Sequence, residues 1–360
     1  MKFKIAFTNI VFLLLLSSCI QEIRGSNPTP VVAVATNQAQ ASAQQQTGIT
    51  PSPAPFQFNL PTPGAEPVSG WRPPLYPVPW AMSAYDHFYF ARPIAADQIN
   101  WPIADYRYGG TFFAGIVHTG VDIDAEQGTP IMAAGPGTVV WAGWGLFSET
   151  PGNINDPYGQ AVVIRHDFGY KDQQLFTIYA HMSKVEAIVS SHVETGDIIG
   201  LVGNTGATTG PHVHFEVRLG ANSFQNTLNP ELWLAPPQGW GVLVGRVMDT
   251  KKDPLSRIEV HVIAEKPKKT FIIKTYGSGG AANHDPYYNE NLVLGDLPAG
   301  IYKILISFNK NEWQTWVEIF PGQVTYFTFE GDNGFNIGPP PASKLKFIPL
   351  VLPLSPTPSP

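Results

Sequence analysis

Short apolar runs separated by glycine and proline are the feature that most limits how this chain can fold. The 360 residues include 35 prolines and 34 glycines, whereas charged residues make up only 14%. Glycine and proline at this frequency break helices and favour turns, which excludes a coiled coil or a helical solenoid. Because 43% of the residues are hydrophobic, the chain can still bury a sizeable core. We therefore expect a mainly β protein.

The predicted strands fall into two groups on either side of Pro236-Pro237. The first group comprises 137–141, 161–164, 176–179 and 213–219, and the second comprises 242–247, 259–264, 270–275, 302–308, 316–320 and 324–329. In the region of the first group, residues 183–190 are the stretch that favours a helix. The pattern predicts a first β-sheet domain over residues 80–236 and a small β-sandwich over 239–331, followed by a Pro-rich tail over 332–360.

The amino terminus has the features of an export signal. Lys2 and Lys4 precede an apolar run over residues 10–16, and this run leads directly into Cys19, the single cysteine of the chain. The run is shorter than the roughly 20 apolar residues that cross a bilayer. The stretch Leu-Ser-Ser-Cys resembles a bacterial lipobox, which implies a signal peptide over residues 1–18 and lipidation of Cys19. A plain secretory signal with an incidental cysteine is the alternative.

A lipidated Cys19 would anchor the exported protein in the cell envelope at a membrane surface. Residues 19–79 are rich in proline, glutamine and alanine and show no helical or strand periodicity, which is typical of a linker. The net charge of −6 leaves no basic footprint for nucleic acid, so we expect no nucleic-acid partner. A single cysteine also excludes an intramolecular disulfide and a Cys-rich zinc site.

Histidine and carboxylate side chains gather in three segments of the first domain. His118 and Asp122 are four residues apart, His181 follows an apolar strand, and His212 and His214 alternate with apolar residues. Because successive side chains of a strand point to opposite faces, the last two histidines share a face. Imidazole and carboxylate are zinc ligands, and three protein ligands that leave room for water are typical of a catalytic site. The residues predict zinc on His118, Asp122 and either His212 or His214, with surplus histidines for proton transfer.

These segments resemble the lysostaphin/LytM-type zinc endopeptidases of peptidase family M23. The likeness spans residues 112–218 and rests on 118–124, 128–130, 163–166, 179–181 and 203–216. It implies that His118, Asp122 and His214 bind one zinc ion and that His181 and His212 act on substrate and water. It also implies that the substrate is the peptide part of peptidoglycan. The loop 146–157 is longer than is usual in the family, and we expect it to border the groove.

Several alternatives stay open at this point. The chain could be a catalytically silent, zinc-containing activator or a wall-binding protein, although all five positions carry the residue types of active members. Glu216 shares the face of His214, where it could hydrogen-bond an imidazole or pair with Arg218. His166 follows a strand and is expected to be structural. Residues 239–331 resemble transthyretin-like or carboxypeptidase-regulatory-like sandwiches, a likeness that says little about function.

Overall fold

The structure is a computed structural model that describes residues 74–81, 86–95, 104–111, 116–277 and 280–340. The predicted signal peptide, Cys19, nearly all of the linker 19–79 and most of the tail 332–360 lie outside these ranges. Strands dominate the described residues, which confirms the mainly β prediction. None of the helices described has the length and apolar character needed to cross a membrane. They are 3-10 turns: η1 (Ala104–Tyr106), η2 (Phe224–Asn226), η3 (Pro230–Leu232) and η4 (Gly331–Asn333).

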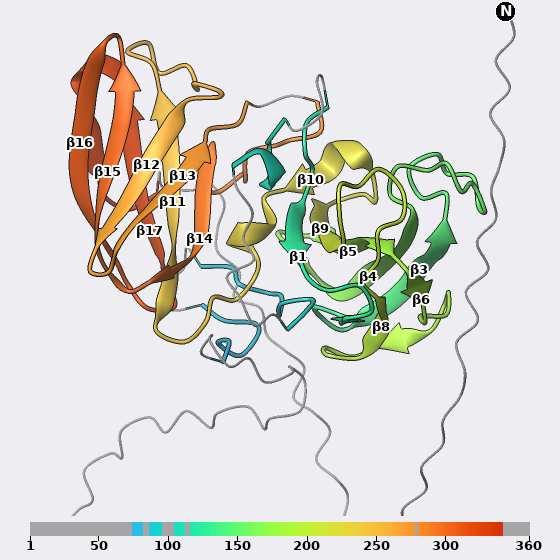
Figure 1. Ribbon diagram of the computed structural model, residues 1–360. Helices are drawn as coiled ribbons and strands as arrows, with labels where there is room; N and C mark the ends of the chain where they lie inside the picture. Colours follow the sequence, from blue (N-terminus) through green and yellow to red (C-terminus); the bar gives the residue numbers. More distant parts are fainter. Residues whose placement is uncertain (1–73, 82–85, 96–103, 112–115, 278–279, 341–360) are drawn as a thin grey trace, which may run out of the picture. The chain divides into compact units, whose positions relative to one another are not determined.

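The first domain is built on an antiparallel sheet of seven strands (Figure 1). Its order is β1-β9-β5-β4-β3-β7, and β10 pairs with the last residues of β9. The bounds are β1 (Val121–Asp124), β3 (Gly137–Trp144), β4 (Gln160–Tyr170), β5 (Gln173–Met182), β7 (His192–Val193), β9 (His212–Leu219) and β10 (Thr227–Leu228). All four predicted strands of this domain lie within observed ones. The strand β9 lies between β1 and β5, so its two histidines have candidate residues on both sides.

A smaller sheet has the order β2-β8-β6. Its strands are β2 (Pro130–Met132), β6 (Lys184–Val185) and β8 (Ile198–Leu201). The helix expected over 183–190 is therefore wrong. The N–H groups of Glu186 and Ala187 both donate to the carbonyl oxygen of Ile199, at 2.9 and 3.1 Å. Pairing with β8 satisfies backbone groups that an isolated short helix would leave open at its ends, and a local sequence window does not contain this partner.

The C-terminal part is a sandwich of two four-stranded sheets, β14-β11-β17-β18 and β13-β12-β15-β16. Side chains from both sheets form one buried cluster that includes Leu243, Val260, Ile304 and Phe327. This confirms the sandwich, and β14 and β18 are strands that the pattern did not predict. The expected tail boundary at residue 332 is wrong, because β18 pairs with β17 inside the sandwich. The bounds are β11 (Trp240–Met248), β12 (Glu259–Glu265), β13 (Lys268–Lys274), β14 (Leu292–Pro298), β15 (Gly300–Phe308), β16 (Asn311–Ile319), β17 (Val324–Glu330) and β18 (Phe335–Ile337).

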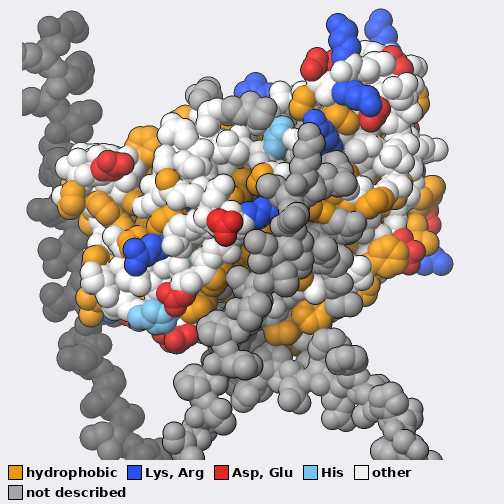
Figure 2. Space-filling view, turned by 180° about the vertical axis from the view of Figure 1, so that it is seen from behind, with side chains coloured by type: hydrophobic (Ala, Val, Ile, Leu, Met, Phe, Trp, Pro, Cys, Tyr) orange, Lys and Arg blue, Asp and Glu red, His pale blue; other side chains and the backbone are white. Residues whose placement is uncertain are grey.

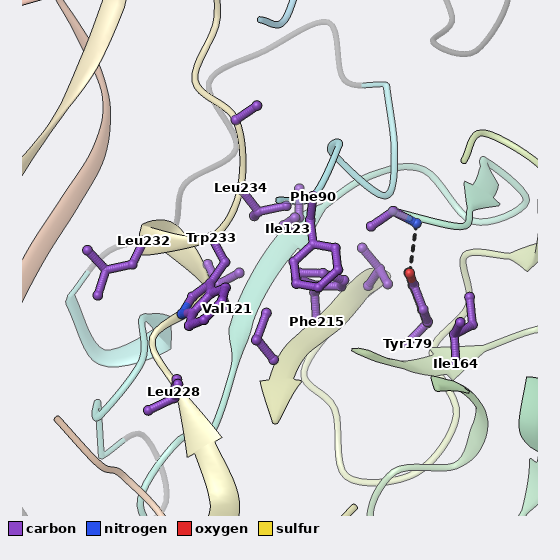
Figure 3. Close-up of a cluster of buried hydrophobic side chains, with 14 of the residues drawn as sticks. Phe90, Val121, Ile123, Ile164, Tyr179, Phe215, Leu228, Leu232, Trp233 and Leu234 are labelled. Carbon is purple, nitrogen blue, oxygen red and sulfur yellow. Dashed lines mark hydrogen bonds between the residues drawn. The ribbon is translucent and has the colours of Figure 1, made fainter. Parts of the chain in front are cut away.

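The largest buried cluster reaches across the expected boundary between residues 236 and 239. Figure 3 shows its centre, where Phe90, Phe215 and Trp233 come together from separate stretches of the chain. Val244 of β11 and Tyr326 of β17 belong to the same cluster, although both strands are part of the sandwich. The described residues therefore form one compact unit.

Charged side chains on the surface are mixed in sign. Figure 2 shows acidic and basic side chains interspersed with apolar ones over the described part of one face. Several large apolar side chains are exposed in both parts of the structure, among them Ile188, Ile198, Ile301 and Trp316. Surface charge alone therefore does not mark a functional site, which has to be found from the chemistry of particular residues.

Candidate metal centre

The centre forms where β1 and β9 pair. Asp122 of β1 lies opposite His214 of β9 in the antiparallel register. His118 lies in the loop just before β1, and Gly120 allows this loop to approach β9 closely. A Cβ atom on Gly120 would meet the carbonyl oxygen of Phe215 at 2.4 Å and the His214 ring at 2.9 Å. Glycine at this position therefore brings the two elements into contact.

Three side-chain atoms converge at this point: His118 Nε2, Asp122 Oδ1 and His214 Nδ1. Each lies 2.9 Å from the other two. The sequence pattern left the choice between His212 and His214 open, and the structure places His214 in this triangle. His212 is the more distant of the two, with its Nε2 at 3.5 Å from Asp122 Oδ1. Both histidines and Asp122 are shielded from solvent, with at most 7% of each residue exposed.

Each of the two ligand histidines has one ring nitrogen in the triangle, the inner nitrogen, and one that faces away from it, the outer nitrogen. The partner of the outer nitrogen decides which of the two carries a proton. His118 Nδ1 lies 3.1 Å from the carbonyl oxygen of Arg107, and His214 Nε2 lies 3.0 Å from Glu216 Oε1. Both partners are acceptors, so both outer nitrogens carry a proton, and in the neutral form of each ring the inner nitrogen presents a lone pair. Together with Asp122 Oδ1, three lone pairs face one another. Such a set needs a cation, and two imidazoles with a carboxylate match zinc, which binds these ligands at about 2.0–2.2 Å.

Glu216 orients His214 and is itself fully buried. Its Oε1 accepts hydrogen bonds from Thr119 Oγ1 at 2.5 Å and Tyr158 OH at 2.6 Å, and its Oε2 accepts from Arg218 Nε at 2.8 Å. Both alternatives weighed for Glu216 therefore occur together. Buried carboxylates that hold a ligand histidine fix its tautomer and ring orientation.

Burial and charge shift the pKa values of this group in opposite directions. Although burial raises the pKa of Glu216, the neighbouring Arg218 and His214 hold it far below its usual value. Burial alone would lower the pKa of His214, but the hydrogen bonds and charges of Asp122 and Glu216 together raise it to about 9. Burial also acts to raise the pKa of Asp122, and His118 and His214 keep it well below normal. Without a metal, a proton on His214 therefore neutralises the cluster.

His181 and His212 lie beside the triangle. Their ring centroids are 4.8 Å apart, and the His181 centroid is 5.6 Å from that of His214. His181 Nδ1 faces the carbonyl oxygen of Thr205 and His212 Nδ1 faces that of Gly210, both at 2.8 Å. Each Nδ1 therefore carries a proton, and each Nε2 presents a lone pair.

Both of these histidines are held in the neutral form. Burial, followed by the charges of His214 and His212, lowers the pKa of His181 to about 3. Burial likewise lowers the pKa of His212. His181 also has a φ of 64°, in the left-handed region, which a residue other than glycine adopts at an energetic cost. Such strain is concentrated at functional sites, where the surrounding structure enforces it.

All five candidate residues line one groove of about 510 Å³. Phe147 and Pro157 also line it, so the loop 146–157 borders the groove as expected. Tyr158 and Thr119 were missed from the sequence. Glu216 was found because strand alternation places it beside His214, whereas Tyr158 comes from a loop with no fixed spacing to β9 and only the fold brings it near.

His166 lies outside this group. It is buried in the core, where its Nε2 lies 2.8 Å from Thr177 Oγ1 and its Nδ1 lies 3.1 Å from the carbonyl oxygen of Pro136. Burial lowers the pKa of His166 to about 4. These contacts agree with the structural role expected for it.

The sequence of this region is similar to that of known peptidases. Residues 116–227 match the model of peptidase family M23. The DD-carboxypeptidase/endopeptidase Mpg of Neisseria meningitidis is 35% identical over 127 residues, which cover 35% of this chain and 26% of that protein. The peptidoglycan DD-endopeptidase ShyA of Vibrio cholerae is 39% identical over 101 residues, 28% of this chain and 20% of that protein. The chain thus spans about a quarter of the length of these relatives, or less.

Solved structures of M23-type peptidases are also similar to part of this chain. The catalytic domain of lysostaphin from Staphylococcus simulans has 27% sequence identity and a TM-score of 0.29, and the match covers 37% of this chain and 86% of that one. The structure of LytU has 28% identity and a TM-score of 0.30, covering 37% of this chain and 81% of that one. Taken together with the site geometry, the sequence matches support a peptidase M23 domain of the lysostaphin type within residues 116–227.

Proposed function

We propose that this protein is a zinc-dependent endopeptidase that hydrolyses peptide bonds of peptidoglycan. The observation that carries the proposal is the convergence of three lone pairs, from His118, Asp122 and His214, in a groove that also holds His181 and His212. Relatives of this domain include a peptidoglycan DD-endopeptidase and a DD-carboxypeptidase/endopeptidase, which supports the substrate class.

Zinc, when bound, would act as a Lewis acid that lowers the pKa of a bound water and polarises the carbonyl of the scissile peptide bond. The chain supplies proton transfer through His181 and His212. Because their Nδ1 protons are held by carbonyl oxygens, each Nε2 can accept a proton from the attacking water. A protonated ring can then donate to the amine as the carbon–nitrogen bond breaks, or stabilise the negative oxygen of the tetrahedral state. The water's atoms end on the new carboxylate and amine.

We propose further that the protein acts in the cell envelope, held at a membrane surface by lipidated Cys19. The basic residues Lys2 and Lys4, the apolar run that follows them and the Leu-Ser-Ser-Cys stretch support this location. The linker 19–79 would let the catalytic part reach a polymer that is fixed in place. Replacement of Cys19 by alanine tests the anchor, because the variant should leave the membrane fraction or stay unprocessed.

The deciding experiment measures zinc and hydrolysis on the same preparation of the full chain. We expect one zinc ion per chain and release of free amino groups from purified peptidoglycan. Removal of zinc with a chelator should abolish the release, and added zinc should restore it. A protein that holds zinc but releases nothing would instead support the catalytically silent activator, and a protein without zinc affinity would refute the metal site.

A further inference from the structure

Part of the groove comes from the C-terminal sandwich. Gly280 and Ala281, in the connection between β13 and β14, line the same groove as His118 and His214. The family match ends at residue 227, so these residues lie outside it. We call residues 280–283 the wall segment.

The wall segment is bonded to the first domain through its backbone and through Asn283. Ala282 forms a parallel bridge with Thr227, whose hydroxyl donates to the carbonyl oxygen of Ala281. The side-chain amide of Asn283 donates to the carbonyl oxygens of Gln225 and Thr227, at 2.8 and 3.0 Å. These bonds hold the wall segment next to η2, whose Phe224 also lines the groove.

Tyr108 stabilises the wall segment through hydrogen bonds and ring packing. Its hydroxyl donates to the carbonyl oxygen of Thr227 at 2.8 Å and accepts from the backbone N–H of Asn283 at 2.7 Å. Its ring packs edge-on against Tyr276, with 5.2 Å between centroids. A Cβ on Gly109 would lie 2.2 Å from the Cβ of Tyr276, so the close approach requires glycine there. Tyr108, Tyr276 and Ala282 form a buried cluster, which anchors the wall segment through Ala282.

Apolar atoms make up most of the surface of the groove, and the hydroxyl groups of Tyr106, Thr208 and Thr209 also line it. Ile116, Val117, Phe147 and Phe224 line it, and among the described lining residues the ionisable groups other than tyrosine are those of the candidate metal centre. A charged side chain near the scissile bond would therefore lose hydration and find no oppositely charged side chain outside the metal centre among the described lining residues. The short side chain of Ala281 leaves space that a larger residue would fill.

We propose that the wall segment determines specificity: it closes the groove so that peptides with small, uncharged side chains beside the scissile bond are preferred. This inference rests on the proposed function for its substrate class. The sandwich then belongs to the substrate site itself, with Ala281 as the residue that limits the size of the accepted side chain.

The test changes the size of residue 281 and compares two synthetic cross-linked stem peptides. They differ at one residue beside the scissile bond, alanine in one and leucine in the other. In the wild type we expect a higher kcat/KM for the alanyl peptide. Ala281→Gly should lower the alanyl-to-leucyl ratio about tenfold, since one methyl or methylene group in an apolar pocket changes kcat/KM by roughly that much. Ala281→Leu should raise KM for both peptides.

The matched control is Ala299→Gly, at an exposed alanine of the same sandwich, which should leave the ratio unchanged. Zinc content and the melting temperature of each variant show whether the metal centre and the fold persist. If Ala281→Leu fails to fold, Ala281→Gly still decides. An unchanged ratio in folded, zinc-containing Ala281→Gly would overturn the wall segment as a specificity element.

Measurements of peptide binding without cleavage distinguish a failure of this inference from a failure of the proposed function. The dissociation constants of both peptides are measured on zinc-depleted protein, where no cleavage occurs. If the wild type binds but never cleaves, and Ala281→Gly still shifts the binding ratio toward the leucyl peptide, the proposed function fails and the wall segment stands. If cleavage occurs and neither ratio shifts, the wall segment fails alone. If the zinc-containing protein cleaves neither peptide and the zinc-depleted protein binds neither, both are refuted.

Discussion

His214 and His212 share one face of β9 but hold different positions relative to Asp122. His214→Ala removes one of three converging lone pairs, so both zinc content and hydrolysis should collapse. His212→Ala leaves all three, so most of the zinc should remain. Its activity should still fall by roughly 10²- to 10⁴-fold, the usual contribution of a positioned acid–base group. The measurement is zinc stoichiometry and amino-group release on gel-filtered variants. Zinc loss in His212→Ala with retention in His214→Ala would mean that the two roles are reversed.

Zinc affinity should depend on pH through His214. In the metal-free protein its pKa is raised to about 9, so the ring is protonated at neutral pH and must lose that proton to bind metal. Asp122 stays ionised throughout this range because its pKa is held well below normal. The apparent affinity should therefore rise about tenfold per pH unit between pH 7 and 9. Competition with a chelator of known affinity measures this slope, and a flat profile would contradict the raised pKa.

At the scale of elements, the pairing of β1 with β9 depends on Gly120. Gly120→Ala places a Cβ against backbone and against the His214 ring, so the strands must separate. We expect a stability loss of about 1–3 kcal/mol, as for other overpacked sites, together with weaker zinc binding. Gly210→Ala is the control, because a Cβ at Gly210 has no neighbour within 4 Å. Chemical denaturation and zinc titration of both variants check this, and equal behaviour would refute the steric role of Gly120.

Strand alternation predicted the face of β9 correctly, because a period of two is a local property of the chain. It grouped His212, His214 and Glu216 before any partner strand was known, and the family resemblance then distinguished the two histidines. Alternation cannot predict which strand lies next to β9, nor that Tyr158 reaches Glu216 from a loop. The prediction of a helix over 183–190 is wrong for the same reason. The backbone there bonds to the carbonyl oxygen of Ile199, which lies outside a local sequence window.

At the scale of the whole molecule, the first domain and the sandwich share buried side chains. Val242, Val244, Tyr288, Val293 and Tyr326 belong to the same cluster as Phe215. Burial of one such side chain contributes about 1.5–3 kcal/mol, which is a large fraction of the net stability of a typical domain, about 5–15 kcal/mol. The predicted boundary between residues 236 and 239 therefore separates two sheet systems that stabilise each other.

Truncation tests this coupling. A fragment of residues 74–237 exposes the apolar surface that β11, β14 and β17 cover, so we expect a markedly lower melting temperature than for residues 74–340. The longer chain should unfold in one transition. Calorimetry of both measures the effect. A fragment as stable as the longer chain, or two separate transitions in the longer chain, would show that the shared cluster contributes little.

The parallel pairing of β11 with β17 also affects the order in which parts of the structure can form during synthesis. During synthesis the proposed metal ligands are made before the wall segment. The sheet that contains β11 is complete only after β17 has been made. A chain interrupted before residue 280 would carry every histidine of the centre beside an open groove. Completion of the groove is thus postponed until the wall segment has been synthesised, well after the last histidine of the centre, so the order of synthesis itself delays the mature site.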